Sequence, residues 1–257
     1  KRLLIGGFEK IYEIGKHFRN EGIDRTHNPE FTMLELYESY SDVSGMMSLC
    51  ENLIKDISKS LDIEVVEFMG NKINLNQKFS KISMSDLVKN EIGTDVLNMD
   101  NSQLYKLCKK HNLDVEKKMN FGQLFDKLFS SLIEPKLIQP TFVFDYPKSI
   151  SPLAKVHREN SELAERFELF IAGMEFANAF SELNDPIDQR KRFEDQLALL
   201  ESGDEEAHQM DIDFIESMEV GMPPTGGIGI GIDRLIMLLL EKDSIKDIIL
   251  FPSLRNK

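Results

Sequence analysis

Cysteine is scarce in this sequence, and long apolar runs are missing. Only Cys50 and Cys108 are present, far apart and in no CxxC pair, so neither a disulfide framework nor a zinc site is indicated. Apolar runs such as residues 235–240 fall well short of the roughly 20 residues that a membrane span needs. The first residues carry no signal-peptide pattern. We therefore expect a soluble, cytoplasmic protein with no membrane contact.

Positive charge is also in short supply. The 257 residues carry a formal net charge of -13, which argues against a general nucleic-acid coat, because phosphate neutralisation supplies most non-specific affinity. A local basic surface or an absent partner domain could still hold RNA. A hydrophobic content of 41% is enough for a sizeable core, so the length fits one large domain or one with an inserted subdomain. The sequence begins in mid-pattern without an initiator methionine, so we expect a fragment.

The N-terminal part has the pattern of a strand-loop-strand hairpin followed by a helix. Residues 8–19 are rich in aromatic and β-branched side chains, residues 20–29 are polar, and residues 31–40 alternate strictly. Apolar residues at spacings of three and four over 43–61 predict an amphipathic helix that packs against the sheet. Short strands at 64–68 and 72–75 predict a second hairpin.

The middle of the chain has mainly helical spacing. Residues 83–134 predict helices, which suggests a small helical insertion over residues 76–140. Residues 141–146 are strand-like. Strands at 166–171 and 175–182 are expected to pair across a turn at Gly173 and Met174. Helices at roughly 186–202 and 211–220 are expected to precede a glycine-punctuated strand and a buried C-terminal helix.

The first hairpin carries four side chains with the chemistry of a nucleotide site within thirteen residues. Arg19 offers a planar fork for phosphate, and Glu21 offers a carboxylate for an amine or amide. His27 adds an imidazole ring, and Phe31 can stack on a base. Each of them alone is more typical of an exposed polar turn, but together they indicate a nucleotide site.

Two carboxylates in the predicted central strand pair suggest a magnesium site. Glu168 and Glu175 are seven residues apart across a tight turn, so both could face one Mg²⁺ ion, with ATP phosphates completing the shell. Asn178, Phe180 and Glu182 share one parity and should line one face of the strand. Glu175 has the opposite parity, so it needs the turn or a bulge to point the same way. The alternative is a solvated edge face.

The stretch GGIGIGIDR, residues 226–234, is not a Rossmann fingerprint, because its glycines alternate and the acidic residue follows too early. Glycines in a strand usually indicate close backbone packing. Here they could let a ligand or a neighbouring helix approach the sheet, with Arg234 reaching a phosphate.

These stretches, in this order, resemble the class II aminoacyl-tRNA synthetases, and among them the lysine-specific enzymes. FRNEG with HNPEFTMLELY, within 18–37, is similar to the family's second signature, and GGIGIGIDRLIMLLL, at 226–240, to its third. ISPLAK at 150–155, EFANAFSELNDP at 175–186 and ILFP at 249–252 also resemble the lysine enzymes. The likeness spans essentially the whole chain. An aspartate or asparagine enzyme would share the architecture but not HNPEFTMLELY or FANAFSELNDP.

The resemblance implies an α+β fold, an antiparallel sheet flanked by helices, as one catalytic domain over residues 1–257. It also implies the nucleotide contacts. Arg19 would bind the α-phosphate and the substrate carboxylate, and Glu21 the lysine α-amino group or adenine. His27 and Arg234 would hold the distal phosphates, while Phe31 and Arg234 would sandwich adenine. Mg²⁺ would be coordinated by Glu168 and Glu175.

The resemblance further implies a pocket for the lysine side chain. Its members would be Glu35, Tyr37, Asn178, Phe180 and Glu182. Glu182 is the expected direct partner, because an ammonium group that leaves water needs a carboxylate and hydrogen-bond acceptors around it. Such a site should reject uncharged isosteres strongly, since they would leave buried carboxylates unpaired.

The implied activity is ATP-dependent activation of L-lysine followed by transfer to the 3′ end of tRNA(Lys). The lysine carboxylate would attack the α-phosphorus in line and expel pyrophosphate. No protein nucleophile is needed, so catalysis would rest on positioning and on charge stabilisation by Arg19, Arg234 and Mg²⁺.

The family's first signature, the anticodon-binding OB-fold domain and one acidic contact to lysine would lie upstream of Lys1. The resemblance implies a homodimer in the full-length protein, built partly through that first signature. Two other functions stay open. One is a paralogous ligase that attaches a lysine-type residue to elongation factor P, and the other is a non-catalytic synthetase-like binding module. SPLAK, SELNDP and ILFP favour the tRNA enzyme, and the occupied catalytic positions argue against the module.

Overall fold

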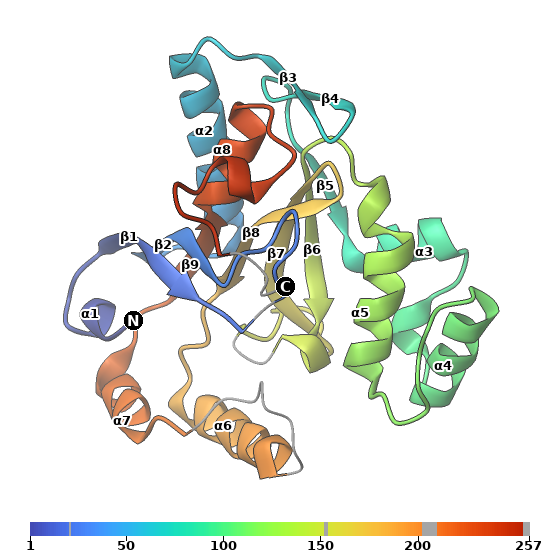
Figure 1. Ribbon diagram of the computed structural model, residues 1–257. Coiled ribbons are helices and arrows are strands. Elements are labelled where there is room, and N and C mark those ends of the chain that lie inside the picture. Colours follow the sequence, from blue (N-terminus) through green and yellow to red (C-terminus); the bar gives the residue numbers. More distant parts are fainter. Residues whose placement is uncertain (21, 152–153, 202–209, 254–257) are drawn as a thin grey trace.

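A seven-stranded sheet runs through the centre of the computed structural model, which describes residues 1–20, 22–151, 154–201 and 210–253, without the side chains of 195 and 198–201. Figure 1 shows the sheet with helices around it. From edge to edge, the strands are β1 (Lys10–Phe18), β2 (Glu30–Ser39), β9 (Thr225–Gly231), β8 (Met174–Ser181), β7 (Leu163–Ile171), β6 (Thr141–Pro147) and β5 (Ser80–Ser83).

The sheet is mixed, and one pair corrects the expectation of a purely antiparallel sheet. All neighbouring strands are antiparallel except β5 and β6, which run parallel. β5 has no counterpart among the strands predicted from the sequence. Its four residues give too short a pattern, and the strand exists because its backbone pairs with β6. The α+β class with flanking helices is confirmed.

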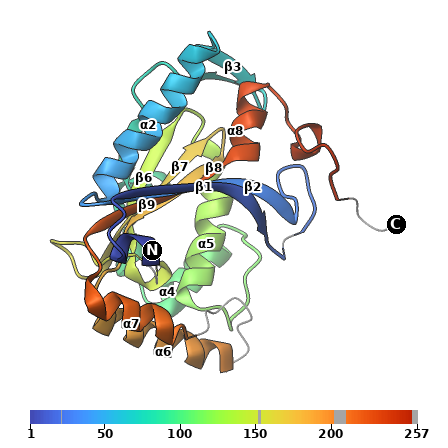
Figure 2. The ribbon, with the colours of Figure 1, turned by 90° about the vertical axis from the view of Figure 1, so that its left-hand side faces the viewer.

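Helices cover both faces of the sheet (Figure 2). α2 (Val43–Ser60) and α8 (Ile232–Leu239) lie on one face, and α6 (Pro186–Glu201) and α7 (Ile212–Gly221) lie on the other. A four-residue helix, α1 (Arg2–Ile5), which the sequence did not predict, packs on α7. In the described part of the chain, no helix is long and apolar enough to span a bilayer.

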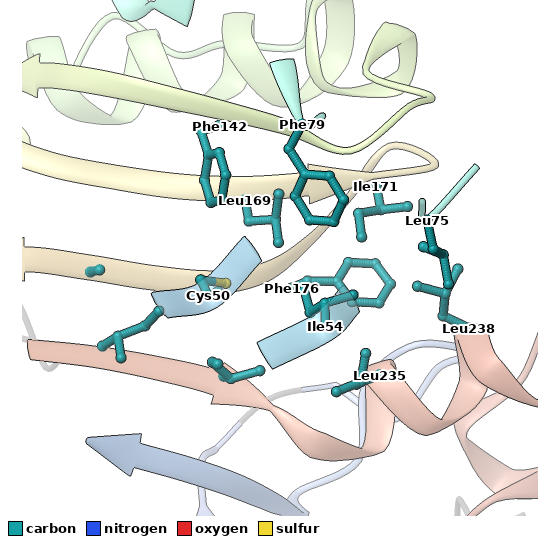
Figure 3. Close-up of a cluster of buried hydrophobic side chains, with 14 of the residues drawn as sticks. Cys50, Ile54, Leu75, Phe79, Phe142, Leu169, Ile171, Phe176, Leu235 and Leu238 are labelled. Carbon is teal, nitrogen blue, oxygen red and sulfur yellow. The ribbon is translucent and has the colours of Figure 1, made fainter. Parts of the chain in front are cut away.

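The main core lies between the sheet and the pair α2 and α8 (Figure 3). Phe142 is fully buried, and its ring meets the ring of Phe167 edge to face at 5.0 Å between centroids. Cys50 and Ile54 of α2 belong to the same cluster as these strand residues, and so does Leu235 of α8. The spacing predicted over 43–61 thus corresponds to a real buried stripe.

A second core forms under the helical region. α3 (Met84–Ile92) and α5 (Phe121–Leu132) bury their apolar faces against β6 and β7, where Phe170 packs on Phe129 at 5.6 Å between ring centroids, and α4 (Asn101–Lys110) packs on α5. The helices agree with the prediction for 83–134, while β5 belongs to the central sheet. Whether residues 76–140 form a separate insertion stays a prediction.

The short connections are the hairpin β3 (Val65–Phe68) with β4 (Asn71–Asn74) and four single 3₁₀ turns. The turns are η1 (Val96–Asn98), η2 (Glu134–Lys136), η3 (Lys148–Ile150) and η4 (Ile245–Asp247). The hairpin is the one predicted at 64–75.

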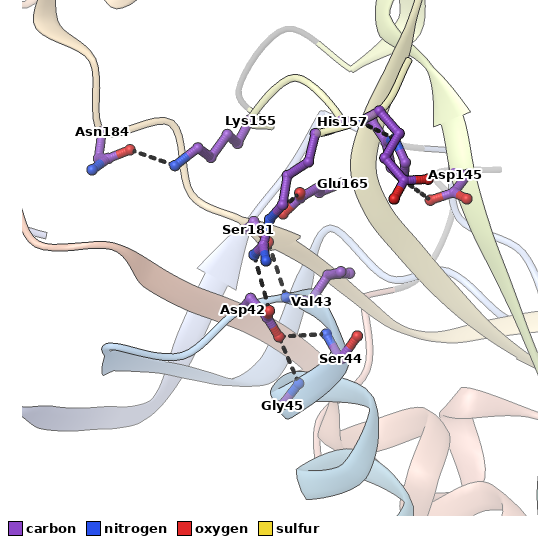
Figure 4. Close-up of polar contacts among 12 residues, drawn as sticks. Asp42, Val43, Ser44, Gly45, Asp145, Lys155, His157, Glu165, Ser181 and Asn184 are labelled. Carbon is purple, nitrogen blue, oxygen red and sulfur yellow. Dashed lines mark hydrogen bonds and ion pairs between the residues drawn. The ribbon is translucent and has the colours of Figure 1, made fainter. Parts of the chain in front are cut away.

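A chain of polar contacts holds the start of α2 against the sheet (Figure 4). The Asp42 carboxylate caps the helix by accepting from the backbone N–H groups of Ser44 and Gly45, and it also accepts from Arg158 at 3.0 Å. Arg158 reaches the buried Glu165 of β7 at 2.8 Å. These contacts fix α2 over the strands that carry the site.

Candidate active site

Two rows of side chains cross the sheet on the face opposite to the main core. Residues directly opposite each other in antiparallel strands project to the same face. One row is Glu35, Gly229, Asn178 and Glu168, and the next is Tyr37, Gly227, Phe180 and Arg166. Five residues that the sequence placed in one site therefore lie on one surface, although they come from three strands.

Glycine at alternate positions of β9 clears the space above these rows. A Cβ on Gly227 would overlap the Glu182 carboxylate and lie 2.8 Å from Cδ1 of Tyr37, and a Cβ on Gly229 would lie 2.6 Å from Cε of Met33. Ile228 and Ile230, between the glycines, are buried in the main core. The glycines thus serve the ligand side of the sheet, while the isoleucines pack against the helices.

A β-bulge turns Glu175 toward this face, as the parity argument required. Leu169 pairs with Ala177, but the next residue, Phe170, pairs with Glu175, so Phe176 is the extra residue. The turn differs by one position from the prediction. Ala172 and Gly173 form it, both with positive φ, which matches the twist of a two-residue hairpin.

A cavity of about 290 Å³ opens above the rows at the ends of β2 and β9. Its lining includes seven residues that the sequence singled out, six of them for nucleotide or metal binding and Asn178 for the amino-acid pocket. These are Arg19, His27, Phe31, Glu168, Glu175, Asn178 and Arg234. Glu35, Tyr37, Phe180 and Glu182 do not line it, and they belong to a second region, farther along the same face.

A hydrogen bond between Arg234 and His27 joins α8 to the loop before β2 in the wall of this cavity. Nη2 of Arg234 donates to Nε2 of His27 at 3.0 Å, and Nη1 donates to the backbone carbonyl of Glu175 at 2.6 Å. The other His27 nitrogen, Nδ1, lies 2.9 Å from the Asp24 carboxylate. Burial opposes ionisation of Asp24, but hydrogen bonds from Thr26 and His27 lower its pKa to about 2. The result is a carboxylate–imidazole–guanidinium chain.

Glu168 is held by three donors. Tyr146 donates its hydroxyl to Oε2 at 2.8 Å, Asn178 donates Nδ2 to Oε1 at 3.1 Å, and Arg166 forms an ion pair with Oε1. The Arg166 guanidinium also lies 4.6 Å from the centre of the Tyr146 ring. This arrangement fixes the direction of the Glu168 carboxylate.

Glu175 lies in an environment that disfavours its ionised form. Burial and the nearby negative charge of Glu168 raise the pKa of Glu175 to about 7. A buried carboxylate whose ionisation is opposed by a neighbouring carboxylate forms with it a donor set that would favour a hard divalent cation. Among the described residues no three acidic, histidine or cysteine side chains converge on one point, so the remaining ligands would have to come from the bound nucleotide and water.

Glu182 forms the far end of the site. It is buried, with 3% of its surface exposed, directly after β8. Next to it is Tyr37, whose pKa is raised by burial and by the negative charges of Glu182 and Glu35. A buried carboxylate of this kind requires a cationic partner.

The whole arrangement agrees with the comparison to known proteins. Residues 1–255 match the family described as tRNA synthetases class II (D, K and N). The chain belongs to the class II tRNA synthetases.

Several relatives of this synthetase domain bear the name lysine–tRNA ligase. Those of Halalkalibacterium halodurans and Staphylococcus saprophyticus are each 52% identical to it, and that of Bacillus cereus is 50% identical, in each case over 100% of this chain and 52% of the relative. The chain spans about half the length of these curated relatives.

The synthetase domain brings together most of the residues expected for ATP. Arg19 and Phe31 are neighbours, with the guanidinium 5.3 Å from the ring centre, and both line the cavity with Arg234. Glu21 lies outside the described residues. The individual contacts to ATP, lysine and Mg²⁺ stay predictions.

Sequence reasoning missed residues that position the synthetase site. Tyr146 holds Glu168, Asp24 orients His27, and Asp233 at the start of α8 accepts from the backbone N–H of Thr32 at 2.6 Å. Asp24 could have been noticed as the first residue of an Asx turn before Thr26 and His27. Tyr146 had no local signal, because its partner lies on another strand.

Proposed function

We propose that this chain is the catalytic part of a lysine–tRNA ligase, which activates L-lysine with ATP and transfers it to tRNA(Lys). The observation that carries this proposal is the buried Glu182, which already holds a primary ammonium group: Nζ of Lys1 lies 2.6 Å from its Oε2. The names of the relatives support the same substrate.

The residues of the cavity have the chemistry for adenylate formation. Arg19 and Arg234 are permanent cations on either side of the cavity, suited to a phosphate group and to the charge that develops when pyrophosphate leaves. With Nδ1 of His27 directed to Asp24, its Nε2 is an acceptor for Arg234 and keeps that guanidinium in place. The amino-acid carboxylate would attack the α-phosphorus in line, and the contribution of the protein is position and charge.

Mg²⁺ fits the carboxylate pair. Glu168 and Glu175 would hold it, and when bound it would neutralise charge on the triphosphate. The donors on Glu168 direct its oxygens, and a bound cation would offset the burial and the charge of Glu168, which together raise the pKa of Glu175 to about 7.

The wider assembly follows from the same proposal. The protein would work in the cytoplasm as a homodimer and take tRNA(Lys) as acceptor. A ligase that acts on elongation factor P is the second candidate, but the names of the relatives favour the tRNA enzyme. Acceptor assays with tRNA and with elongation factor P separate the two.

The direct test is lysine-dependent exchange between ATP and pyrophosphate. It would be run on this chain and on a chain extended at its N-terminus, with arginine, asparagine and aspartate as competitors. Exchange with lysine alone supports the proposal. If neither chain shows exchange while both are folded and bind ATP or lysine, a binding module is the better assignment. Exchange only in the longer chain means that added residues complete the site.

Two substitutions test the lysine end and the metal end of the site independently. Glu182→Gln should weaken lysine binding far more than ATP binding, because the ammonium group loses its charged partner. Equal losses for both ligands would contradict that role. Glu175→Ala should abolish adenylate formation, and an unchanged Mg²⁺ dependence would contradict its role.

A further inference from the structure

Lys1 occupies the pocket end that the proposed function assigns to the substrate side chain. Its Nζ lies 2.6 Å from Oε2 of Glu182, with 23% of the Lys1 side chain and 2% of the Glu182 side chain exposed. Apart from this ion pair, Oε2 has no hydrogen-bonding partner in the described part of the chain. The Lys1 ammonium group also lies 5.9 Å from the ring centre of Phe214 on α7.

The position of Lys1 is set by the fold. It precedes α1, and α1 packs on α7, beside which the N-terminus lies in both Figure 1 and Figure 2. Arg2, the next residue, turns away and pairs with Asp211 at 3.1 Å. Of two adjacent cations, one therefore enters the pocket and the other stays at the surface.

Space around the Glu182 carboxylate is limited. Oε1 lies over Gly227, where even a methyl group would overlap it, and Tyr37 closes the same side. Oε2 is the oxygen that Lys1 holds. A substrate ammonium group that pairs with Oε2 would therefore compete with Lys1.

We propose that Lys1 is a specificity-determining residue, whose ε-ammonium group is a resident cation that the substrate's side-chain ammonium group displaces from Glu182. The inference rests on the proposed function, because it names the competitor at that site. In the empty pocket Lys1 prevents a buried, uncompensated carboxylate. When lysine enters, one ammonium group replaces another, and Lys1 swings outward past Phe214.

Displacement supplies selectivity for charge. A neutral side chain of the same length cannot form an ion pair with Glu182, so it cannot displace Lys1 from the pocket. A cationic side chain restores the ion pair that it breaks. This selectivity lowers the affinity for lysine, because each lysine that binds must first displace Lys1 from the Glu182 carboxylate.

The first experiment measures whether lysine exposes Lys1. The chain is treated with an amine-acylating reagent, and modification of the Lys1 ε-amine is quantified by mass spectrometry relative to exposed Lys16, which corrects for reagent consumed by free amino acid. We expect the ratio to rise when L-lysine is added and to stay constant with L-norleucine. An unchanged ratio at a lysine concentration that saturates binding would overturn the proposal.

The second experiment measures affinity by titration calorimetry with L-lysine. Lys1→Met should bind lysine roughly three- to tenfold more tightly than the unmodified chain, the range expected for loss of one partly screened competing ion pair. Arg2→Met is the matched control, since it removes the same charge one residue away from a surface pair and should leave lysine affinity unchanged. Weaker or unchanged binding by Lys1→Met contradicts displacement.

The outcomes separate this inference from the proposed function. If the unmodified chain binds lysine and Lys1→Met binds it no more tightly, only the inference fails. If the unmodified chain does not bind lysine but Lys1→Met does, Lys1 blocks the pocket and the inference holds. If neither binds lysine while both are folded by circular dichroism, the inference fails, and the proposed function is decided by the exchange assay on the longer chain.

Discussion

Nη2 of Arg234 lies 3.0 Å from Nε2 of His27, so one hydrogen bond joins the loop before β2 to the first turn of α8. Arginine can only donate, which makes Nε2 of His27 the acceptor and places the ring proton on Nδ1, facing Asp24 at 2.9 Å. The two stretches that most resemble the family signatures are therefore joined through His27, and Asp24, a residue outside the predicted set, orients that ring.

Asp24→Asn should weaken ATP binding while lysine binding is retained. The amide no longer fixes the proton of His27 on Nδ1, so the ring loses its defined acceptor toward Arg234. We expect a loss of roughly fivefold in ATP affinity, which corresponds to about 1 kcal/mol for one hydrogen bond. Fluorescence titration with an ATP analogue measures it. Asp56→Asn, at an exposed position of α2, is the control, and an identical affinity in both variants would contradict the role of Asp24.

The same substitution predicts a pH dependence of stability. The hydrogen bonds that Asp24 accepts outweigh its burial and lower its pKa from 3.8 to about 2. A carboxyl group with a lowered folded-state pKa stabilises the fold above its unfolded pKa, and this contribution is lost as the pH falls through the folded value. Urea unfolding should show a difference between the two proteins that is constant above pH 3.8 and vanishes near pH 2. It should stay below about 1 kcal/mol, because solvent screens this half-exposed group.

Gly227→Ala should remove lysine binding with little effect on ATP. The added methyl group would overlap the Glu182 carboxylate and lie 2.8 Å from the Tyr37 ring, so both side chains must move. We expect at least a roughly tenfold loss of lysine affinity, the scale of overpacking a rigid site. In Gly15→Ala, the new methyl group would meet only the Glu13 side chain at 3.4 Å, and calorimetry on both variants gives the comparison. Equal lysine affinity would show that the pocket tolerates the methyl group.

Tyr146→Phe should slow adenylate formation without changing lysine affinity. The hydroxyl is one of three donors to Glu168, and its loss lets that carboxylate turn. Because the proposed function makes Glu168 an Mg²⁺ ligand, we expect the maximal rate of pyrophosphate exchange to fall roughly tenfold. Tyr40→Phe, at an 81% exposed position, should have no effect. If both variants exchange at the same rate over a Mg²⁺ titration, Tyr146 has no positioning role.

Phe142→Ala should be strongly destabilising. The side chain is fully buried and packs edge to face on Phe167 and against Phe79, at 5.0 and 5.9 Å between ring centres. Its removal should lower the free energy of unfolding by about 3–5 kcal/mol, the usual cost of a large cavity. Denaturant titration measures the change. Phe8→Ala, 58% exposed, should shift stability by no more than about 0.5 kcal/mol, and similar losses in both would contradict the assignment of this core.

Local patterns were sufficient where one side of an element is buried. Strict alternation predicted that Leu34 and Tyr37 face opposite sides of β2, as they do, and spacings of three and four identified α2. Parity along β8 required a bulge near Glu175, and the structure has one. In each case buried and exposed side chains alternate along consecutive residues with the period of the strand or helix, so the sequence itself shows the pattern.

Patterns failed where backbone pairing or a distant partner creates the feature. β5 exists through its parallel pairing with β6, and α1 through its packing on α7. Four-residue elements carry too few residues for a period to appear. The turn between β7 and β8 was displaced by one residue, because positive φ at Ala172, a non-glycine residue, has no sequence signal.

The sequence by itself determined the chemistry of the site: which arginines, carboxylates, rings and glycines are present, and their order along the strands. Only the tertiary structure decided how they meet. The strand order β2-β9-β8-β7 places Tyr37 beside Gly227 and Phe180, and the packing of α1 on α7 brings Lys1 to Glu182. Side-chain periodicity depends on neighbours in the chain, whereas strand order and helix docking depend on contacts between residues far apart in sequence, which local patterns do not contain.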